Sequence, residues 1–139
     1  MLFRSLLIPA PPGGRLALPL GALAEHIGDG GRVITIGSNT AVKAFPGSSV
    51  YSMTKAAVAM LVKCVALDLA PRGITVNNIQ PGPTLTDMTA GHIDQVQQMI
   101  PLNRVGSPSE IGALAAYLAG PEAGYMTGAS LTVDGGMSL

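Results

Sequence analysis

Tyr51 and Lys55 are the residues of this sequence whose types and spacing could do chemistry. They lie four positions apart in the stretch YSMTK, so on a helix a phenol and an amine would share one face. A phenol can give or take a proton, and a neighbouring ammonium group favours the charged phenolate, so such a pair can transfer protons to a substrate. A tyrosine and a lysine on one helix face also occur by chance. The surrounding elements must therefore decide between proton chemistry and an ordinary helix surface.

Three short apolar runs are typical of strands that are covered on both faces: RVITIG, ITVNNIQ and SLTV. Helical patterns separate them, over 50–70, over 91–100 and over the run SPSEIGALAAYLA. That last run opens with a capping box of Ser107 and Glu110. Strands that alternate with helices form parallel sheets through right-handed crossovers. The sequence therefore predicts an α/β fold.

The residues whose side chains could take part in a reaction follow the ends of these strands. Ser38 comes directly after RVITIG, Tyr51 and Lys55 lie on the next helix, and the segment PGPTLTDM follows the second strand. Because ligands bind beyond the carboxyl ends of parallel strands, we expect these groups to converge on one site. The simpler alternatives are that Ser38 only caps a strand end and that Pro81 and Gly82 form only a turn.

The amino-acid composition of the chain predicts self-association. Charged residues make up 12% of the 139 residues and apolar residues 47%, and the net charge of zero gives no reason to expect nucleic acid or an anionic membrane as partner. The helix over 50–70 is apolar nearly all round, although a helix on one face of a sheet usually keeps a polar stripe. We therefore expect a homo-oligomer, formed through this helix and through the edge of the RVITIG strand, which the family resemblance given below implies to be open. The alternative is a small domain that buries the helix internally.

Other candidate sites are few. Cys64, the single cysteine, lies in an apolar helical stretch and is expected to pack rather than react. His26 and His92 have no ligand-like partners at metal spacing, so no metal site is expected. Residues 1–20 form an atypical Pro/Gly/Leu-rich arm, either irregular or with a short FRSLLI strand, and PPGGR interrupts its loose likeness to a signal peptide. No run is expected to span a bilayer, and a cytoplasmic location is predicted.

Four motifs in order carry a resemblance to a known family. They are GRVITIGS, the spacing of Ser38, Tyr51 and Lys55, the run DLAPRGITVNNIQPGPTLTDM, and the terminal MTGASLTVDGG. Together they resemble the short-chain dehydrogenase/reductase family, with 21–139 as the C-terminal part of its domain. The resemblance implies a truncated Rossmann-like, three-layer fold of about three parallel strands with flanking helices. It also implies hydride transfer between NAD or NADP and a carbonyl or alcohol.

The resemblance also implies a role for each residue of the cluster. Tyr51 would match the family's proton donor or acceptor. Lys55 would stabilise the phenolate and hold the nicotinamide ribose, and Ser38 would orient the substrate oxygen. The residues it assigns to cofactor binding are Tyr51, Lys55, Pro81, Gly82, Thr84 and Thr86, with Thr86 at the carboxamide.

Several family features have no counterpart in this sequence. These are the glycine-rich TGxxxGxG turn, the residue that selects NAD or NADP, the NNAG motif, and an asparagine on a helix before RVITIG. We therefore expect an oxidoreductase by descent, whose cofactor binding and activity are weak or absent in the isolated chain. One alternative is a non-catalytic oligomeric protein with a vestigial site. Another is a lyase or isomerase that uses Tyr51 and Lys55 without a dinucleotide.

Overall fold

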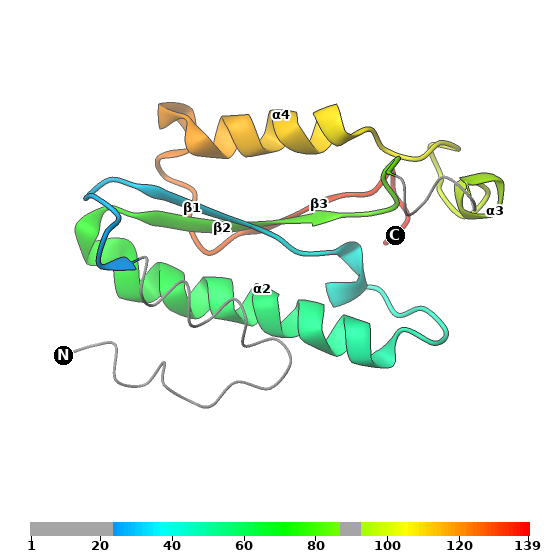
Figure 1. Cartoon of the computed structure of the whole chain (residues 1–139), viewed down its shortest axis with the longest axis horizontal. Helices are drawn as coiled ribbons and strands as arrows, with labels where there is room; N and C mark the ends of the chain where they lie inside the picture. Colours follow the sequence, from blue (N-terminus) through cyan, green and yellow to red (C-terminus); the bar gives the residue numbers. More distant parts are fainter. Residues whose placement is uncertain (1–23, 87–92) are drawn as a thin grey trace.

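Three parallel strands form one sheet, in the order β1-β2-β3, in the computed structural model, which describes residues 24–86 and 93–139. The strands are β1 (Arg32–Ile36), β2 (Thr75–Pro81) and β3 (Ser130–Val133). Helix α2 (Ser49–Leu69) covers one face of the sheet and helix α4 (Pro108–Ala119) covers the other (Figure 1). The predicted α/β fold, with three layers and flanking helices, is confirmed.

Short helical turns complete the described chain. They are η2 (Asn39–Ala41), η3 (Ala70–Arg72), α3 (Ile93–Gln97) and η5 (Pro121–Ala123). Helix α3 ends earlier than the predicted segment 91–100, because Pro101 disfavours helical backbone in the residue before it. The chain makes turns there, with Ile100 N–H bonded to the Gln97 carbonyl at 3.0 Å. The predictions for residues 1–20 lie outside the described residues.

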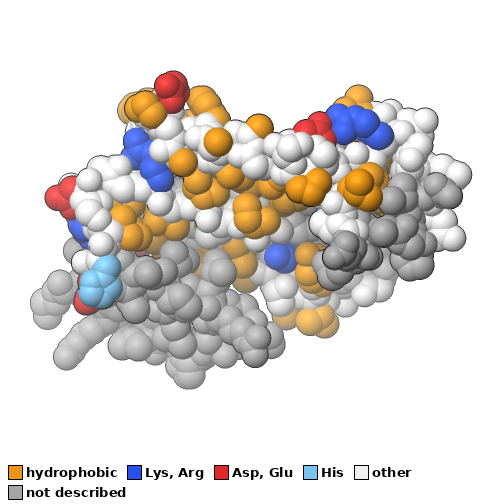
Figure 2. Space-filling view, turned by 45° about the horizontal axis from the view of Figure 1, so that its top comes forward, with side chains coloured by type: hydrophobic (Ala, Val, Ile, Leu, Met, Phe, Trp, Pro, Cys, Tyr) orange, Lys and Arg blue, Asp and Glu red, His pale blue; other side chains and the backbone are white. Residues whose placement is uncertain are grey.

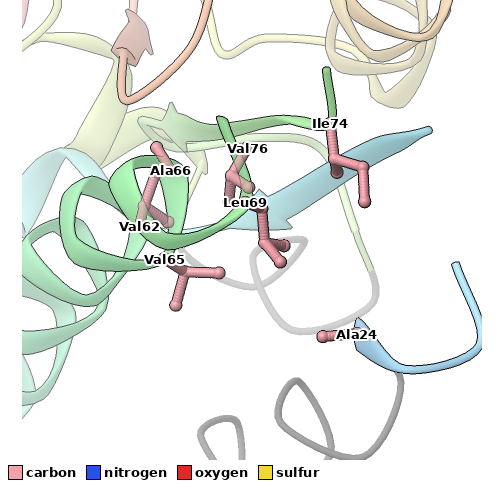
Figure 3. Packing of buried hydrophobic residues seen from close by; sticks show 7 residues of the cluster. All are labelled: Ala24, Val62, Val65, Ala66, Leu69, Ile74 and Val76. Carbon is pink, nitrogen blue, oxygen red and sulfur yellow. The ribbon is translucent and has the colours of Figure 1, made fainter. Parts of the chain in front are cut away.

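The two faces of β2 pack against different helices. Val76 on one face is buried against the C-terminal half of α2, in the cluster drawn in Figure 3. The members of this cluster are Ala24, Val62, Val65, Ala66, Leu69, Ile74 and Val76. Ile79 on the other face is buried with Leu118 of α4, and Ile34 and Leu131 pack against them from the neighbouring strands. The alternation of side chains along a strand explains why the apolar runs of the sequence feed two cores.

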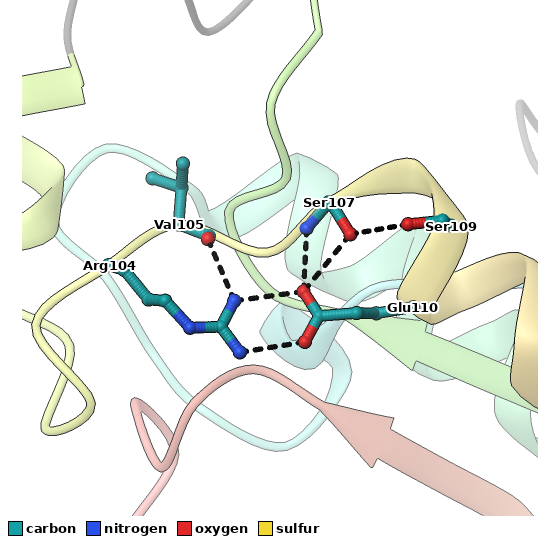
Figure 4. A network of polar contacts seen from close by, with 5 residues as sticks. All are labelled: Arg104, Val105, Ser107, Ser109 and Glu110. Atoms are coloured by element: carbon teal, nitrogen blue, oxygen red, sulfur yellow. Dashed lines mark hydrogen bonds and ion pairs between the residues drawn. The ribbon is translucent and has the colours of Figure 1, made fainter.

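The start of α4 has the predicted capping box. The Glu110 carboxylate accepts the Ser107 backbone N–H at 2.8 Å and also pairs with Arg104 at 2.7 Å (Figure 4). The Arg104 hydrogen bond and then the Ser107 N–H lower the pKa of Glu110 to about 2. Figure 2 shows hydrophobic side chains spread over the face that carries α4, with few charged side chains among them.

A row of polar side chains crosses the sheet at the register where Thr35, Asn78 and Ser130 are neighbours. The Thr35 hydroxyl donates to Asn78 Oδ1 at 2.9 Å, and Asn78 Nδ2 donates to Ser130 Oγ at 3.1 Å. Asn78 is fully buried, so these bonds replace the water that its amide loses on folding. The row joins all three strands and stabilises their alignment across the sheet.

The outer surface of α2 is apolar and exposed. Val50, Met53 and Met60 are exposed along it, and the Leu67 side chain is 78% exposed. Cys64 is exposed as well, so the prediction that it packs rather than reacts is wrong about its packing in this chain. The helix is apolar on two faces, and sequence alone could not show that Cys64 faces away from the sheet, whereas Val62 and Val65 face it.

Helix α2 continued by η3, over Ser49–Arg72, is long and apolar enough to cross a membrane, with a mean hydropathy of 1.5. The prediction that no run reaches this length is therefore wrong by length and composition. Core helices of soluble proteins pass the same test. Val62, Val65 and Leu69 pack one face of this helix against the sheet. Only 17% of the apolar stretch is buried, so most of its surface is exposed in this chain.

Candidate active site

Ser38 is held at the carboxyl end of β1 by the turn that follows it. Its side chain is 8% exposed, and its Oγ accepts the Thr40 backbone N–H at 3.2 Å and the Thr40 hydroxyl at 3.0 Å. Ser38 therefore caps the η2 turn, as the simpler sequence interpretation suggested. Both bonds use the lone pairs of the hydroxyl oxygen, so its proton can be donated to a ligand. The cap and a substrate-orienting role are therefore compatible.

Tyr51 and Lys55 lie one turn apart at the start of α2, as predicted. The Tyr51 side chain is 51% exposed, and Lys55 Nζ lies 5.5 Å from the centroid of its ring, within the range of a cation–π contact. The helix begins after a tight turn, in which the Ser48 hydroxyl donates to the Phe45 carbonyl at 2.7 Å. Ser48 is the N-cap residue, but it uses its side chain for this turn rather than for a helix N–H. The turn thus sets where Tyr51 enters the site.

The segment after β2 supplies the opposite wall. Gly82 N–H donates to the Val133 carbonyl at 2.9 Å, which extends the β2–β3 pairing past Pro81. The Thr84 hydroxyl donates to the Gly82 carbonyl at 3.1 Å, and Thr84 also forms a bridge with Gly106. This wall is therefore a fixed piece of backbone.

Asp134 ties the end of β3 to the turn that carries Ser38. Its carboxylate accepts Asn39 Nδ2 at 3.3 Å, the Gly136 backbone N–H at 3.0 Å and the Ser138 hydroxyl. Burial alone would raise the pKa of Asp134, but the hydrogen bonds from Ser138, Asn39 and the backbone hold it below its ordinary value. The sequence did not indicate this tie, although the VDGG motif that contains Asp134 was part of the resemblance.

Asp134 also explains the glycine in the wall. A Cβ on Gly82 would lie 2.4 Å from the Asp134 Cβ and 2.8 Å from its Cα, so only glycine fits there without movement. The ends of all three strands therefore meet around Asn39, Gly82 and Asp134. Pro81 and Gly82 thus do more than form a turn, because Gly82 also packs closely against Asp134.

The predicted site residues converge on one cleft of about 720 Å³. Those that line it are Ser38, Tyr51, Pro81, Gly82, Thr84 and Thr86. Lys55 is not in the lining and reaches the site through its contact with the Tyr51 ring. The convergence that the strand order predicted is therefore present, with a hydroxyl group on each side of the cleft.

The groups of this cleft suit one end of a nicotinamide dinucleotide. Serine, threonine and tyrosine hydroxyls with a lysine ammonium can hydrogen-bond a ribose and a carboxamide. A glycine-rich turn that meets a helix N-terminus, the usual diphosphate site, does not occur within 24–86 and 93–139. The same residues hold no group of three or more His, Cys, Asp or Glu suited to a metal ion. The described residues therefore suit the nicotinamide end of a dinucleotide and not its diphosphate.

Comparison with known proteins agrees with this geometry. The profile of the family described as enoyl-(acyl carrier protein) reductase matches residues 16–138. Nodulation protein G of Azospirillum brasilense is 42% identical over 112 residues, which cover 78% of this chain and 46% of that protein. A 3-oxoacyl-[acyl-carrier-protein] reductase of Synechocystis is 44% identical over 111 residues, 78% of this chain and 45% of the relative. The chain thus spans about half the length of the curated relatives that it matches.

Solved structures show the same relation. A short-chain dehydrogenase/reductase of Serratia marcescens superposes with a TM-score of 0.83 at 48% identity, over 91% of this chain and 53% of that one. A blue fluorescent protein from a metagenomic library, in complex with NADPH, superposes with a TM-score of 0.82 at 35% identity, over 91% and 54%. The chain therefore belongs to the short-chain dehydrogenase/reductase family and corresponds to the C-terminal half of its members.

Proposed function

We propose that this chain carries the proton-transfer end of an oxidoreductase site that interconverts a carbonyl and an alcohol with NAD or NADP. The observation that supports this most is the single cleft that brings together Ser38, Tyr51 and the wall of Pro81 and Gly82. The family of the chain and an NADPH complex among its structural neighbours agree with the proposal.

Each residue has a distinct task in this proposal. The Tyr51 hydroxyl donates a proton to the carbonyl oxygen during reduction and takes one from the alcohol during oxidation. The Ser38 hydroxyl donates a hydrogen bond to the same oxygen and fixes its position. The ammonium group of Lys55, over the Tyr51 ring, stabilises the charge that develops on the phenol. A bound NAD(P)H would supply the hydride.

The proposal carries an expectation of weak cofactor binding. Thr84 and Thr86 line the cleft and Lys55 lies beside Tyr51, so these residues offer partners for the ribose and carboxamide. The described residues offer no diphosphate site. Catalysis depends on remote binding groups to position the reacting end. We therefore expect slow turnover by the isolated chain, unless a second copy or further chain supplies the rest of the site.

A second candidate function is a non-catalytic assembly protein with a vestigial site. The observation that favours it is the exposed apolar surface of α2, formed by Val50, Met53, Met60 and Leu67. We propose a homo-oligomer through this surface and the open edge of β1, where Ile36 is also exposed. A cytoplasmic location is part of both proposals. Light scattering tests the assembly, and a clean monomer at about micromolar concentration would contradict it.

Calorimetric titration with NADH and NADPH, followed by a turnover assay with a ketone, separates the two functions. We expect saturable binding that Lys55→Met weakens, and a rate that Tyr51→Phe lowers by about 100- to 10,000-fold. Tyr125→Phe is the matched control, because Tyr125 is fully exposed and outside the cleft. No heat at about millimolar concentrations of either cofactor would contradict the oxidoreductase proposal for this chain.

A further inference from the structure

Apolar side chains from separate segments line the same cleft as the hydroxyl groups. Phe45 comes from the turn before α2, Val96 from α3, Ile111 from α4, Met99 from the turn after α3, and Met137 from the tail after β3. Because they line one cleft with Ser38 and Tyr51, the body of a substrate whose carbonyl lies at these two hydroxyls would contact them. The wall that faces the substrate body is therefore apolar.

No charged side chain is among the residues of 24–86 and 93–139 that line this cleft. The cations of neighbouring segments already have partners. Lys43 Nζ donates to the Leu139 carbonyl at 3.1 Å, and Arg104 makes two hydrogen bonds to Glu110, at 2.7 and 2.9 Å (Figure 4). Lys55 lies over the Tyr51 ring. A substrate with an anionic body would thus lose water without gaining a partner charge from the described lining, which is costly.

The two methionines suit an apolar body of variable shape. Methionine is unbranched and polarisable, so it adapts to different apolar surfaces. The Met99 side chain is 57% exposed and forms part of the rim, where a bound alkyl chain or ring would cover it. The cleft volume of about 720 Å³ is within the usual range for small-molecule sites.

We propose that the cleft binds neutral carbonyl compounds with an apolar body, an alkyl chain or a ring, and discriminates against those whose body carries a carboxylate or phosphate. The proposal rests on the proposed function only for the position of the reacting carbonyl, next to Ser38 and Tyr51. The claim itself concerns the chemistry of the substrate body, and a binding measurement without turnover can test it.

Two ketones that differ only at the far end provide the test. 2-Nonanone and 8-oxononanoate share the carbonyl and the chain length, and the second ends in a carboxylate. Protein with isotope-labelled methionine methyl groups reports the site of binding. We expect 2-nonanone to shift the Met99 and Met137 signals saturably and to leave those of Met53 and Met60, on the outer face of α2, unchanged. 8-Oxononanoate should bind at least about tenfold more weakly at neutral pH.

A matched pair of variants locates the effect. Met99→Glu should weaken 2-nonanone binding by about tenfold or more, because a carboxylate then faces the alkyl chain. Met60→Glu is the control, since the two side chains are 57% and 58% exposed and Met60 is outside the cleft. Met99→Leu should keep the affinity of the parent, and circular dichroism checks that each variant is folded.

Two results would overturn the inference: equal or tighter binding of 8-oxononanoate, or no shift of the Met99 and Met137 signals up to the solubility limit of 2-nonanone. Both differ from a failure of the proposed function. Binding of 2-nonanone without NADPH-dependent turnover would leave the inference standing and contradict the oxidoreductase activity. Equally efficient reduction of both ketones would support the oxidoreductase activity and contradict the inferred preference for a neutral substrate body.

Discussion

Replacing Gly82 by alanine should lower the free energy of unfolding by about 3 kcal/mol, near the upper end for substitutions that overpack a structure. The new Cβ would lie 2.4 Å from the Asp134 Cβ and 2.8 Å from its Cα. The Cα belongs to the backbone and cannot swing aside as a flexible side chain could. Backbone movement would stretch the 2.9 Å hydrogen bond from Gly82 to Val133 and the contact between Asn39 and Asp134. The clash therefore cannot be relieved without weakening other contacts.

Urea unfolding followed by far-ultraviolet circular dichroism measures this change, because the chain contains no tryptophan for fluorescence. Gly112→Ala is the matched control. A Cβ on Gly112 meets no atom within 4 Å, and the residue lies inside helix α4. Alanine is favoured over glycine in a helix interior by about 1 kcal/mol. The same chemical change should thus destabilise the protein at position 82 and stabilise it at position 112.

A Gly82→Ala variant that unfolds within about 0.5 kcal/mol of the parent would refute the reasoning. It would mean that the ends of β2 and β3 separate easily, and that Asp134 does not fix the wall of the cleft. Nuclear magnetic resonance of the Asn39 side-chain amide gives a second readout. Its signals should move in Gly82→Ala and stay in place in Gly112→Ala.

Two further predictions concern the elements that hold the site in place. Because hydrogen bonds lower the pKa of Glu110 from 4.5 to about 2, its contribution to stability is complete above about pH 4.5 and is lost as the pH falls toward 2. Between about pH 5 and pH 3, the urea concentration at the midpoint of unfolding should therefore fall less for Glu110→Gln than for the parent. Equal decreases would contradict this. Leu118→Ala should cost about 2 to 5 kcal/mol, because Leu118 is fully buried under the sheet. Leu67→Ala, at a 78% exposed position, should stay within about 0.5 kcal/mol in a dilute monomer.

The fold could be predicted because its signals are local in the sequence. The β-branched runs, the capping box of Ser107 and Glu110, and the turn at Pro71–Gly73 each specify their own segment, and their order implies a parallel sheet. The convergence of Ser38 and Tyr51 followed from that order. Which face of α2 points outward did not follow, because a helix that is apolar all round has no pattern that distinguishes its faces. The misplacement of Cys64 has this cause.

The ties between strands could not be predicted for a different reason. The contacts of Asn78 with Thr35 and Ser130 depend on the register of two strand pairs, which the sequence leaves open within a shift of a residue or two. The contact of Asn39 with Asp134 joins residues that are far apart in the chain. Asparagine and aspartate are ordinary turn residues at such positions, so their types alone suggested only loops.

These ties explain how this chain holds Ser38, the proposed substrate-orienting residue, in place. Ser38 is fixed by Thr40 and by the neighbouring Asn39–Asp134 contact, and every one of these bonds joins residues of this chain. Cofactor affinity has a different source, because most of it comes from groups remote from the reacting atoms. We therefore expect the arrangement of the site and the affinity for a dinucleotide to be separable in this protein. A variant such as Gly82→Ala should disturb the first, whereas added chain or a second copy should raise only the second.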